Sequence, residues 1–276
     1  MHHSADLLRS LAAQVGTPYW IYDARVIRQR IADIQFLTDS DGVQARFAMK
    51  ACPATRVLRE MHAAGIWIDA VSGNEVLRAL HAGHPGGHTP PVIALTADVF
   101  RDNALDVILQ HGVLPNIGSP GQIADLTRAG YAGPISLRVN PGFGHGHVNS
   151  CDTGGPSSKH GIWFADLIAA QDAAARAGFP VTMLHAHIGS GPQFQELHDN
   201  LTRLAADFVA LLPHFPDLTA VSLGGGLPHN YRDHGVQIPI EPLHELLDTC
   251  HPRMIPATCH LRLPPATRSV ASVLST

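Results

Sequence analysis

The stretch ARFAMKACPATRVLREMHAAGIWIDAVSGNEVLRALHAG (45–83) repeats one pattern twice, a short apolar segment followed by an amphipathic one. The apolar segments 45–51 and 66–72 have the length and composition of buried strands, while 53–64 and 74–83 carry Leu, Val and Ala at helical spacing. Alternation of strand and helix predicts parallel strands joined by helical crossovers.

The same alternation continues along most of the chain. Further strands are predicted at 92–97, 113–118, 135–140, 182–188 and 220–224, and further helices at 101–111, 119–130, 164–178 and 193–212. The strands are apolar almost throughout, as expected for strands buried on both faces. Seven such steps fit either a doubly wound open sheet or a (β/α)8 barrel, and their spacing does not choose between the two.

The positions of polar residues favour the barrel. Such residues, or glycines, stand at or just past the ends of five different predicted strands, namely Lys50, Ser72, Asn140, His187 with Ser190, and Gly224 to Gly226. Barrel enzymes build their sites on this face from many strands, whereas an open sheet gathers its site at one switch point. We therefore predict an α/β fold of the TIM-type (β/α)8 barrel class.

Three regions are expected along the chain. Residues 1–36 read as an N-terminal segment, with helices at 4–15 and 23–36 around a strand-like TPYWIYD (17–23). Residues 37–250 form the barrel. From 251 onward HPRMIPATCHLRLPPATRSVASVLST has no regular period, and we interpret residues 251–276 as an aberrant or unstructured tail.

Composition narrows the class of function. The chain has 276 residues, 45% of them hydrophobic, and a net charge of -4, so nothing basic suggests a nucleic-acid partner. No apolar run approaches the roughly 20 residues of a membrane helix, and we expect a cytoplasmic protein. The four cysteines form no CxxC pair and are interpreted as free thiols. We predict no metal site.

Lys50 ends the first predicted strand, in FAMKAC (47–52). A charged amine is costly to bury unpaired, and an amine in an apolar site gives up its proton more readily and becomes nucleophilic. Lys50 is therefore a candidate for Schiff-base chemistry. The alternative is a lysine that simply reaches solvent beyond the strand end.

Histidine and glycine mark the ends of the last two predicted strands. In LHAHIGSG (184–191), we expect His185 and His187 to point to opposite sides of the strand, one of them into the barrel. An interior imidazole could stack on an aromatic cofactor, or could be a hydrogen-bonded core residue. The backbone N–H groups of glycines 224–226 could all point to one phosphate. Alternatively, these glycines form an ordinary tight turn.

Two charged residues fall inside predicted strands. A buried Arg138, in LRVN (137–140), needs an anion or another hydrogen-bond acceptor beside it. That anion could belong to a bound molecule, or to an acidic side chain in a structural ion pair. Asp69 is a buried-acid candidate or a partner for a neighbouring cation. The Gly-, His- and Ser-rich segment 142–163 is longer than an ordinary loop, which is typical of lids and binding loops.

Together these pieces resemble the fold-type III pyridoxal-phosphate (PLP) decarboxylases, and among them the diaminopimelate decarboxylases. The matching stretches run in the family's order over residues 17–230 and are FAMKAC (47–52), DAVSGNE (69–75), TADV (96–99), LRVNPGFGHGH (137–147), TGGPSSKHGIW (153–163), HAHIGSG (185–191) and LGGGL (223–227). LRVNPGFGHGH combined with SKHGIW is specific to the diaminopimelate group.

The resemblance implies a barrel of the alanine racemase and decarboxylase type that binds PLP. Lys50 and His187 would be catalytic, the first binding PLP as a Schiff base and the second stacking on its ring. Asp69 and Arg138 would lie beside the cofactor, and the phosphate would be held by Ser190, Gly224, Gly225 and Gly226. The implied reaction decarboxylates a small amino acid, meso-2,6-diaminopimelate, to L-lysine in lysine biosynthesis.

The sequence departs from the family near its end. The family's Glu-Pro-Gly-Arg motif on the eighth strand is not found, because Glu241-Pro242 continues as Leu-His and opens a helix. The family's C-terminal β-domain, which completes the site across a homodimer interface, is also missing. We therefore expect a barrel incomplete at the eighth strand with unpaired edges, loss of the interface through which the family forms homodimers, and weak or no activity for this chain alone. A frameshift or premature end would explain the tail.

Other functions remain open at this point. A decarboxylase of another basic amino acid, such as ornithine or arginine, shares the fold type, but the loop 142–163 argues against it. A racemase-like or non-catalytic PLP barrel fits LRVNPGFGHGH and HAHIGSG poorly. An inactive remnant is consistent with the missing motif and domain. A metal-dependent hydrolase would need convergent His and acidic residues, which the sequence does not show.

Overall fold

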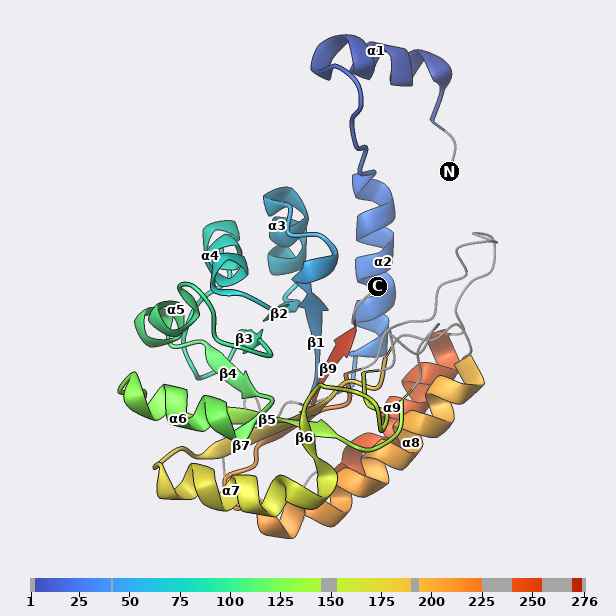
Figure 1. The fold of residues 1–276 in the computed structure, drawn as a ribbon. Helices are drawn as coiled ribbons and strands as arrows, with labels where there is room; N and C mark the ends of the chain where they lie inside the picture. The colour runs from blue at the N-terminus through green and yellow to red at the C-terminus, as the bar shows by residue number, and fades with distance from the viewer. Residues whose placement is uncertain are drawn as a thin grey trace.

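The computed structural model describes residues 3–40, 42–144, 153–189, 194–224, 240–254 and 270–274. Its centre is a parallel sheet that curls into an incomplete barrel (Figure 1). Along the ladder the strands follow the order β8-β7-β5-β4-β3-β2-β1-β9, and β6 pairs with β5 off this path. The bounds are β1 (Val43–Ala48), β2 (Trp67–Ala70), β3 (Ile93–Thr96), β4 (Leu114–Ile117), β5 (Ile135–Asn140), β6 (Ile162–Trp163), β7 (Val181–Ala186), β8 (Ala220–Ser222) and β9 (Val270–Leu274).

Helices run between successive strands and surround the sheet (Figure 1). They are α3 (Thr55–Ala63), α4 (Gly73–Ala82), α5 (Ala104–His111), α6 (Pro120–Arg128), α7 (Leu167–Arg176), α8 (Phe194–Leu211) and α9 (Ile240–Met254), preceded by α1 (Ala5–Val15) and α2 (Ala24–Leu37). Within the described ranges no helix has both the length and the apolar character needed to cross a membrane.

Local sequence explains where these helices begin and end. At the start of α4 the Ser72 hydroxyl accepts a hydrogen bond from the Glu75 N–H, and the Glu75 carboxylate accepts one from the Val71 N–H. This reciprocal arrangement satisfies N–H groups that the first turn of a helix leaves unpaired. The helix ends at Gly83, which adopts a left-handed conformation with φ of 112°.

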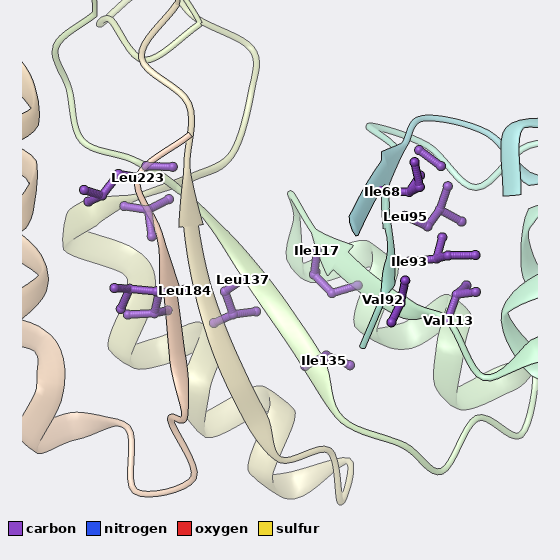
Figure 2. Packing of buried hydrophobic residues seen from close by; sticks show 14 of the residues in the cluster. Ile68, Val92, Ile93, Leu95, Val113, Ile117, Ile135, Leu137, Leu184 and Leu223 are labelled. Atoms are coloured by element: carbon purple, nitrogen blue, oxygen red, sulfur yellow. The ribbon is translucent and has the colours of Figure 1, made fainter. Parts of the chain in front are cut away.

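The core fills the space between the sheet and its helices (Figure 2). Ile68, Ile93, Ile117, Leu137 and Leu184, from five different strands, are completely buried. Burying each such side chain stabilises the fold by about 1.5–3 kcal/mol relative to leaving it exposed. The near-continuous apolar character of the strands follows from their position between helices and barrel interior.

The barrel closes only partly. Strand β9 pairs in parallel with β1, from Val43 with Val270 to Phe47 with Leu274. Strand β8 lies beside β9, but no ladder joins these two strands within the described part of the chain. The predicted (β/α)8-type barrel, incomplete at its last position, is therefore confirmed.

The seven predicted strands are all present, with ends shifted by a few residues, and the predicted helices are present as well. The strand-like residues 17–23 have no strand conformation in the structure, and Trp20 is 91% exposed. A strand-like composition forms a strand only where a sheet edge accepts it.

The expectation of an irregular tail is wrong for two segments. Helix α9 continues as far as Met254, and Val270–Leu274 form strand β9 against β1. The apolar VASVL sequence follows a stretch rich in proline and arginine, and only its tertiary pairing reveals it as a strand. The division of the chain at residues 36 and 250 stays a prediction.

Candidate active site

A pocket of about 230 Å³ opens at the carboxyl ends of the barrel strands. Its walls come from the ends of five strands and from the segment that precedes β6. The lining residues are Ala48, Lys50, Asp69, Val71, Thr96, Ala97, Asp98, Arg138, Thr153, His160, His185 and His187.

Four of the predicted site residues meet in this pocket: Lys50, Asp69, Arg138 and His187. They arrive from β1, β2, β5 and β7, which places side chains far apart in sequence around one cavity. This gathering is the arrangement expected for the carboxyl face of a barrel. The predicted residues Ser190, Gly225 and Gly226 lie outside the described residues.

Lys50 lies in a short 3-10 turn, Met49–Ala51, that directly follows β1. Met49 is completely buried and anchors the turn, whereas Lys50 is exposed and lines the pocket. Of the two positions considered for this amine, the structure therefore shows the one that reaches solvent beyond the strand end. The strand delivers the lysine to the open side of the pocket, where an incoming molecule can reach it.

Asp69 is the acid of the pocket nearest the barrel interior, and only 8% of it is exposed. Burial raises the pKa of its carboxyl group, while the Thr96 hydrogen bond and the charges of Arg46, Lys50 and Arg138 act in the opposite direction. Thr96 Oγ1 donates to Asp69 Oδ1 at 2.5 Å. Three surrounding cations make a buried carboxylate tolerable here.

Asp98 contacts three basic side chains at the rim of the pocket. Its carboxylate accepts a hydrogen bond from His160 Nδ1 at 2.8 Å and faces Arg138 at 3.7 Å and Lys159 at 3.5 Å. Burial would raise the pKa of Asp98, but His160, Arg138 and Lys159 outweigh it and hold that pKa below its usual value. Asp98 thus orients Arg138, whose own pKa is lowered by burial.

Sequence reasoning assigned no role to Asp98 or His160, although both fall in stretches that carry the family resemblance. A signal for Asp98 was available, because it stands one residue past the predicted strand 92–97. No comparable signal pointed to His160, which follows a long loop and meets Asp98 only in the folded chain.

His185 and His187 both line the pocket, so the prediction that they face opposite sides is wrong. Side chains two positions apart in a strand share a face, because successive side chains alternate. His185 is 3% exposed and His187 is half-buried. Burial, with the charge of Arg138, lowers the pKa of His185 well below 6.5.

Gly224 follows β8 and brings the backbone close to the end of β7. Its φ of 60° is left-handed, and an added Cβ would overlap the Ala186 carbonyl oxygen and approach His187 Cα. Glycine is therefore required at this position on two grounds, conformation and space. Thr153 Oγ1 donates to the His187 carbonyl at 2.8 Å and fastens the segment before β6 to the same place.

Comparison with protein families matches residues 25–264 to the pyridoxal binding domain of pyridoxal-dependent decarboxylases. Among curated proteins, the diaminopimelate decarboxylase of Escherichia coli strain K12 is 38% identical over 249 residues, which are 90% of this chain and 55% of that protein. The diaminopimelate decarboxylase of Streptomyces coelicolor is 37% identical over 248 residues, 90% of this chain and 54% of that protein. The chain thus spans about half the length of these relatives.

Solved structures give the same fold. A crystal structure of a diaminopimelate decarboxylase superposes with a TM-score of 0.81 at 32% identity, covering 99% of this chain and 61% of the other. The Helicobacter pylori diaminopimelate decarboxylase, solved in complex with L-lysine, has a TM-score of 0.81 at 19% identity, covering 97% of this chain and 66% of that one. At that identity the second likeness concerns the fold alone.

Proposed function

Because the chain belongs to the pyridoxal-dependent decarboxylases, we propose that it forms the PLP-binding part of a diaminopimelate decarboxylase. The proposed reaction releases CO₂ from meso-diaminopimelate and leaves L-lysine. The observation that carries the proposal is the meeting of Lys50 with Asp69, Arg138 and His187 in one pocket. The similarity to diaminopimelate decarboxylases over 90% of the chain supports the choice of substrate.

The residues of the pocket fit PLP. An exposed amine, Lys50, is available to hold the cofactor, and the half-buried imidazole of His187 offers a flat face for its ring. At Gly224 the backbone approaches β7 so closely that a side chain would not fit. Gly224 also begins the run of three glycines whose backbone N–H groups are the proposed phosphate ligands.

When bound, PLP supplies an electron sink for the pair of electrons released as a carboxylate leaves as CO₂. The chain's own residues place the reacting groups. Arg138 provides a fixed positive charge for an anionic group, held in place by Asp98. Asp69 lies buried beside the cations of the pocket, which act against the rise that burial causes in its pKa, and the Lys50 amine is positioned to hold or return a proton.

The lysine content of the chain makes the first test unusually specific. The sequence contains two lysines, Lys50 and Lys159. The chain would be mixed with PLP, reduced with borohydride, digested and mapped by mass spectrometry. We expect a phosphopyridoxyl group on Lys50 and little on Lys159, whose exposed side chain serves as the internal control.

Variants complete this test. Lys50→Arg should abolish the adduct, whereas Lys159→Arg should leave it unchanged. Equal labelling of both lysines in the folded protein would show only the general reactivity of amines and would refute the proposed cofactor site.

The substrate can be tested with the same readout. An amino acid that binds productively displaces Lys50 and lowers the amount of Lys50 that borohydride traps. We expect meso-diaminopimelate to do so at lower concentration than L-ornithine or L-arginine. A preference for either of these two would replace the proposed substrate while leaving the cofactor site intact.

A further inference from the structure

A row of hydrogen-bonded side chains connects two walls of the pocket. Thr96 Oγ1 donates to Asp69 Oδ1 at 2.5 Å, and Asn116 Nδ2 lies 3.1 Å from Thr96 Oγ1. The same Asn116 nitrogen lies 3.0 Å from His185 Nδ1. Ser136 Oγ donates to Asn116 Oδ1 at 2.9 Å. The row therefore runs from an acid on β2 to an imidazole on β7.

The sheet itself sets the spacing of this row. Thr96 and Asn116 are register partners on β3 and β4, and Asn116 and Ser136 are register partners on β4 and β5. His185 lies on β7, which pairs with β5. Asn116 is 1% exposed and Ser136 is completely buried. Side chains fixed by a parallel ladder are held more rigidly than side chains on loops.

The position of each proton follows from the chemistry of the groups. The Thr96 hydroxyl gives its single proton to Asp69 Oδ1, so the Thr96 oxygen accepts from Asn116. Asn116 therefore uses its NH₂ group toward both Thr96 and His185, while its oxygen accepts from Ser136. His185 Nδ1 is left as an acceptor, which places the imidazole proton on Nε2.

His185 also lines the pocket, and within the described part of the chain Asn116 is its hydrogen-bond partner. The Nε2–H is thus the group that remains for an occupant. Lys50 and Arg138 line the same pocket, which favours an anionic occupant.

We propose that Asn116 is a positioning residue that fixes His185 as its neutral Nε2–H form, so that His185 donates a hydrogen bond to an anionic oxygen bound in the pocket. The oxygen belongs to the cofactor or to the carboxylate of the amino acid, and only this identification rests on the proposed function. The form of the imidazole is a property of the chain alone.

The first test measures directly which ring nitrogen of His185 carries the proton. In protein labelled with ¹⁵N-histidine, the nitrogen shifts of a ring distinguish Nδ1–H from Nε2–H, and the His185 signals are assigned by their loss in His185→Gln. We expect Nε2–H in the parent chain. Asn116→Asp replaces the donating amide by an acceptor and should move the proton to Nδ1. Asn74→Asp, an exposed asparagine on α4, is the matched control and should change nothing.

Either Nδ1–H in the parent chain or an unchanged His185 in a folded Asn116→Asp variant would overturn the proposal. A second pair of variants serves if Asn116→Asp does not fold. The amide nitrogen of glutamine reaches near the Nε2 position of histidine, whereas that of asparagine reaches only near Nδ1. We expect PLP or meso-diaminopimelate, whichever carries the accepting oxygen, to bind His185→Gln about as well as the parent and His185→Asn about tenfold more weakly, the effect of one hydrogen bond. Equal affinities of the two variants for both ligands would refute the donor role.

Ligand titration separates the two sources of the oxygen. A shift of the His185 Nε2 signal on adding PLP alone assigns the oxygen to the cofactor. A shift that appears only when meso-diaminopimelate is also added assigns it to the substrate, and no shift with both bound refutes the donor role. If PLP leaves no adduct on Lys50, the proposed function fails, while the form of His185 in the free chain still tests the inference.

Discussion

Asp98 at the end of β3 accepts a 2.8 Å hydrogen bond from His160 Nδ1, across 62 positions of sequence. The same carboxylate faces Arg138 at 3.7 Å, and only about 10% of the Arg138 side chain is exposed. One acid therefore ties the segment before β6 to the cation that points into the pocket. The Asp98 carboxylate therefore couples the rim of the site to its interior.

Replacing Asp98 with asparagine should lower both stability and the order of the pocket rim. The partners are partly exposed, so we expect a loss of at most about 1 kcal/mol in the free energy of unfolding near neutral pH. Because the pKa of Asp98 lies below 3.8 in the folded chain, its contribution is present above that value and is lost as pH falls through the folded pKa. Urea unfolding at neutral and strongly acidic pH should show the difference between variant and parent closing in acid. A difference that persists in acid would contradict this explanation.

Arg46 should be the most costly arginine to remove. It is 1% exposed and donates to the carbonyls of Ile68, Val92 and Pro91 at 3.0, 3.1 and 2.5 Å. Burial lowers its pKa to about 10, so it stays charged at neutral pH. We expect Arg46→Met to lose about 3 kcal/mol in the free energy of unfolding, because two buried carbonyls and one partly buried carbonyl lose a charged donor.

Arg9→Met is the matched control for Arg46→Met, since Arg9 forms an exposed pair with Asp6. That variant should change the free energy of unfolding by less than about 0.5 kcal/mol. Chemical unfolding of both variants and the parent would measure these free energies. Similar small losses for the two variants would rule out a structural role for Arg46.

His84 should make stability fall in mild acid. Its Nε2 donates to the Leu58 carbonyl at 3.1 Å, and burial lowers its pKa to about 4 from 6.5. Because the unfolded chain takes up this proton first, stability is full above about pH 6.5 and declines as pH falls toward 4. His84→Gln keeps a hydrogen-bond donor but has no titrating group. Between pH 6.5 and 4 the parent should therefore lose about 2 kcal/mol more of its free energy of unfolding than this variant does. Parallel pH slopes for the two proteins would exclude His84 as the cause.

Gly224→Ala should disturb the pocket as well as the fold. The added methyl group would overlap the Ala186 carbonyl at a backbone φ of 60°. Gly178→Ala is the control, because Gly178 has a φ of 78° but nothing within 4 Å of an added Cβ. The control should lose about 1 kcal/mol from conformation alone. Gly224→Ala should lose more, and only it should weaken PLP binding. Equal effects of the two on stability and binding would show that the close approach to β7 is unimportant.

Much of the barrel could be predicted from local pattern. Apolar runs of strand length and helical spacing of Leu, Val and Ala are properties of neighbouring residues, and these located the seven strands and their helices. Lys50, Asp69, Arg138 and His187 were found because each stands in a stretch that resembles a known family. The structure brings these four together in one pocket.

What escaped prediction depends on contacts between distant segments. Residues 17–23 have strand-forming composition but form no strand, whereas Val270–Leu274 pair with β1. The pairing of Asp98 with His160, and the row from Asp69 to His185, exist only once the strands are in register. The sequence left open whether Lys50 is buried or exposed, because the 3-10 turn after β1 that exposes it cannot be read from the apolar run that precedes it.

The pairing of β9 with β1 has a consequence for how the chain acquires its shape. Val43 pairs with Val270, so this ladder joins residues more than two hundred positions apart. During synthesis, one edge of β1 stays unpaired until the strands and helices between β1 and β9 have been made. Contacts of such long sequence separation form slowly, because a large loop must close before the ladder gains stability. Closure of the barrel seam is therefore expected to be the last and slowest event of folding, and the exposed edge of β1 the site most open to mispairing before it.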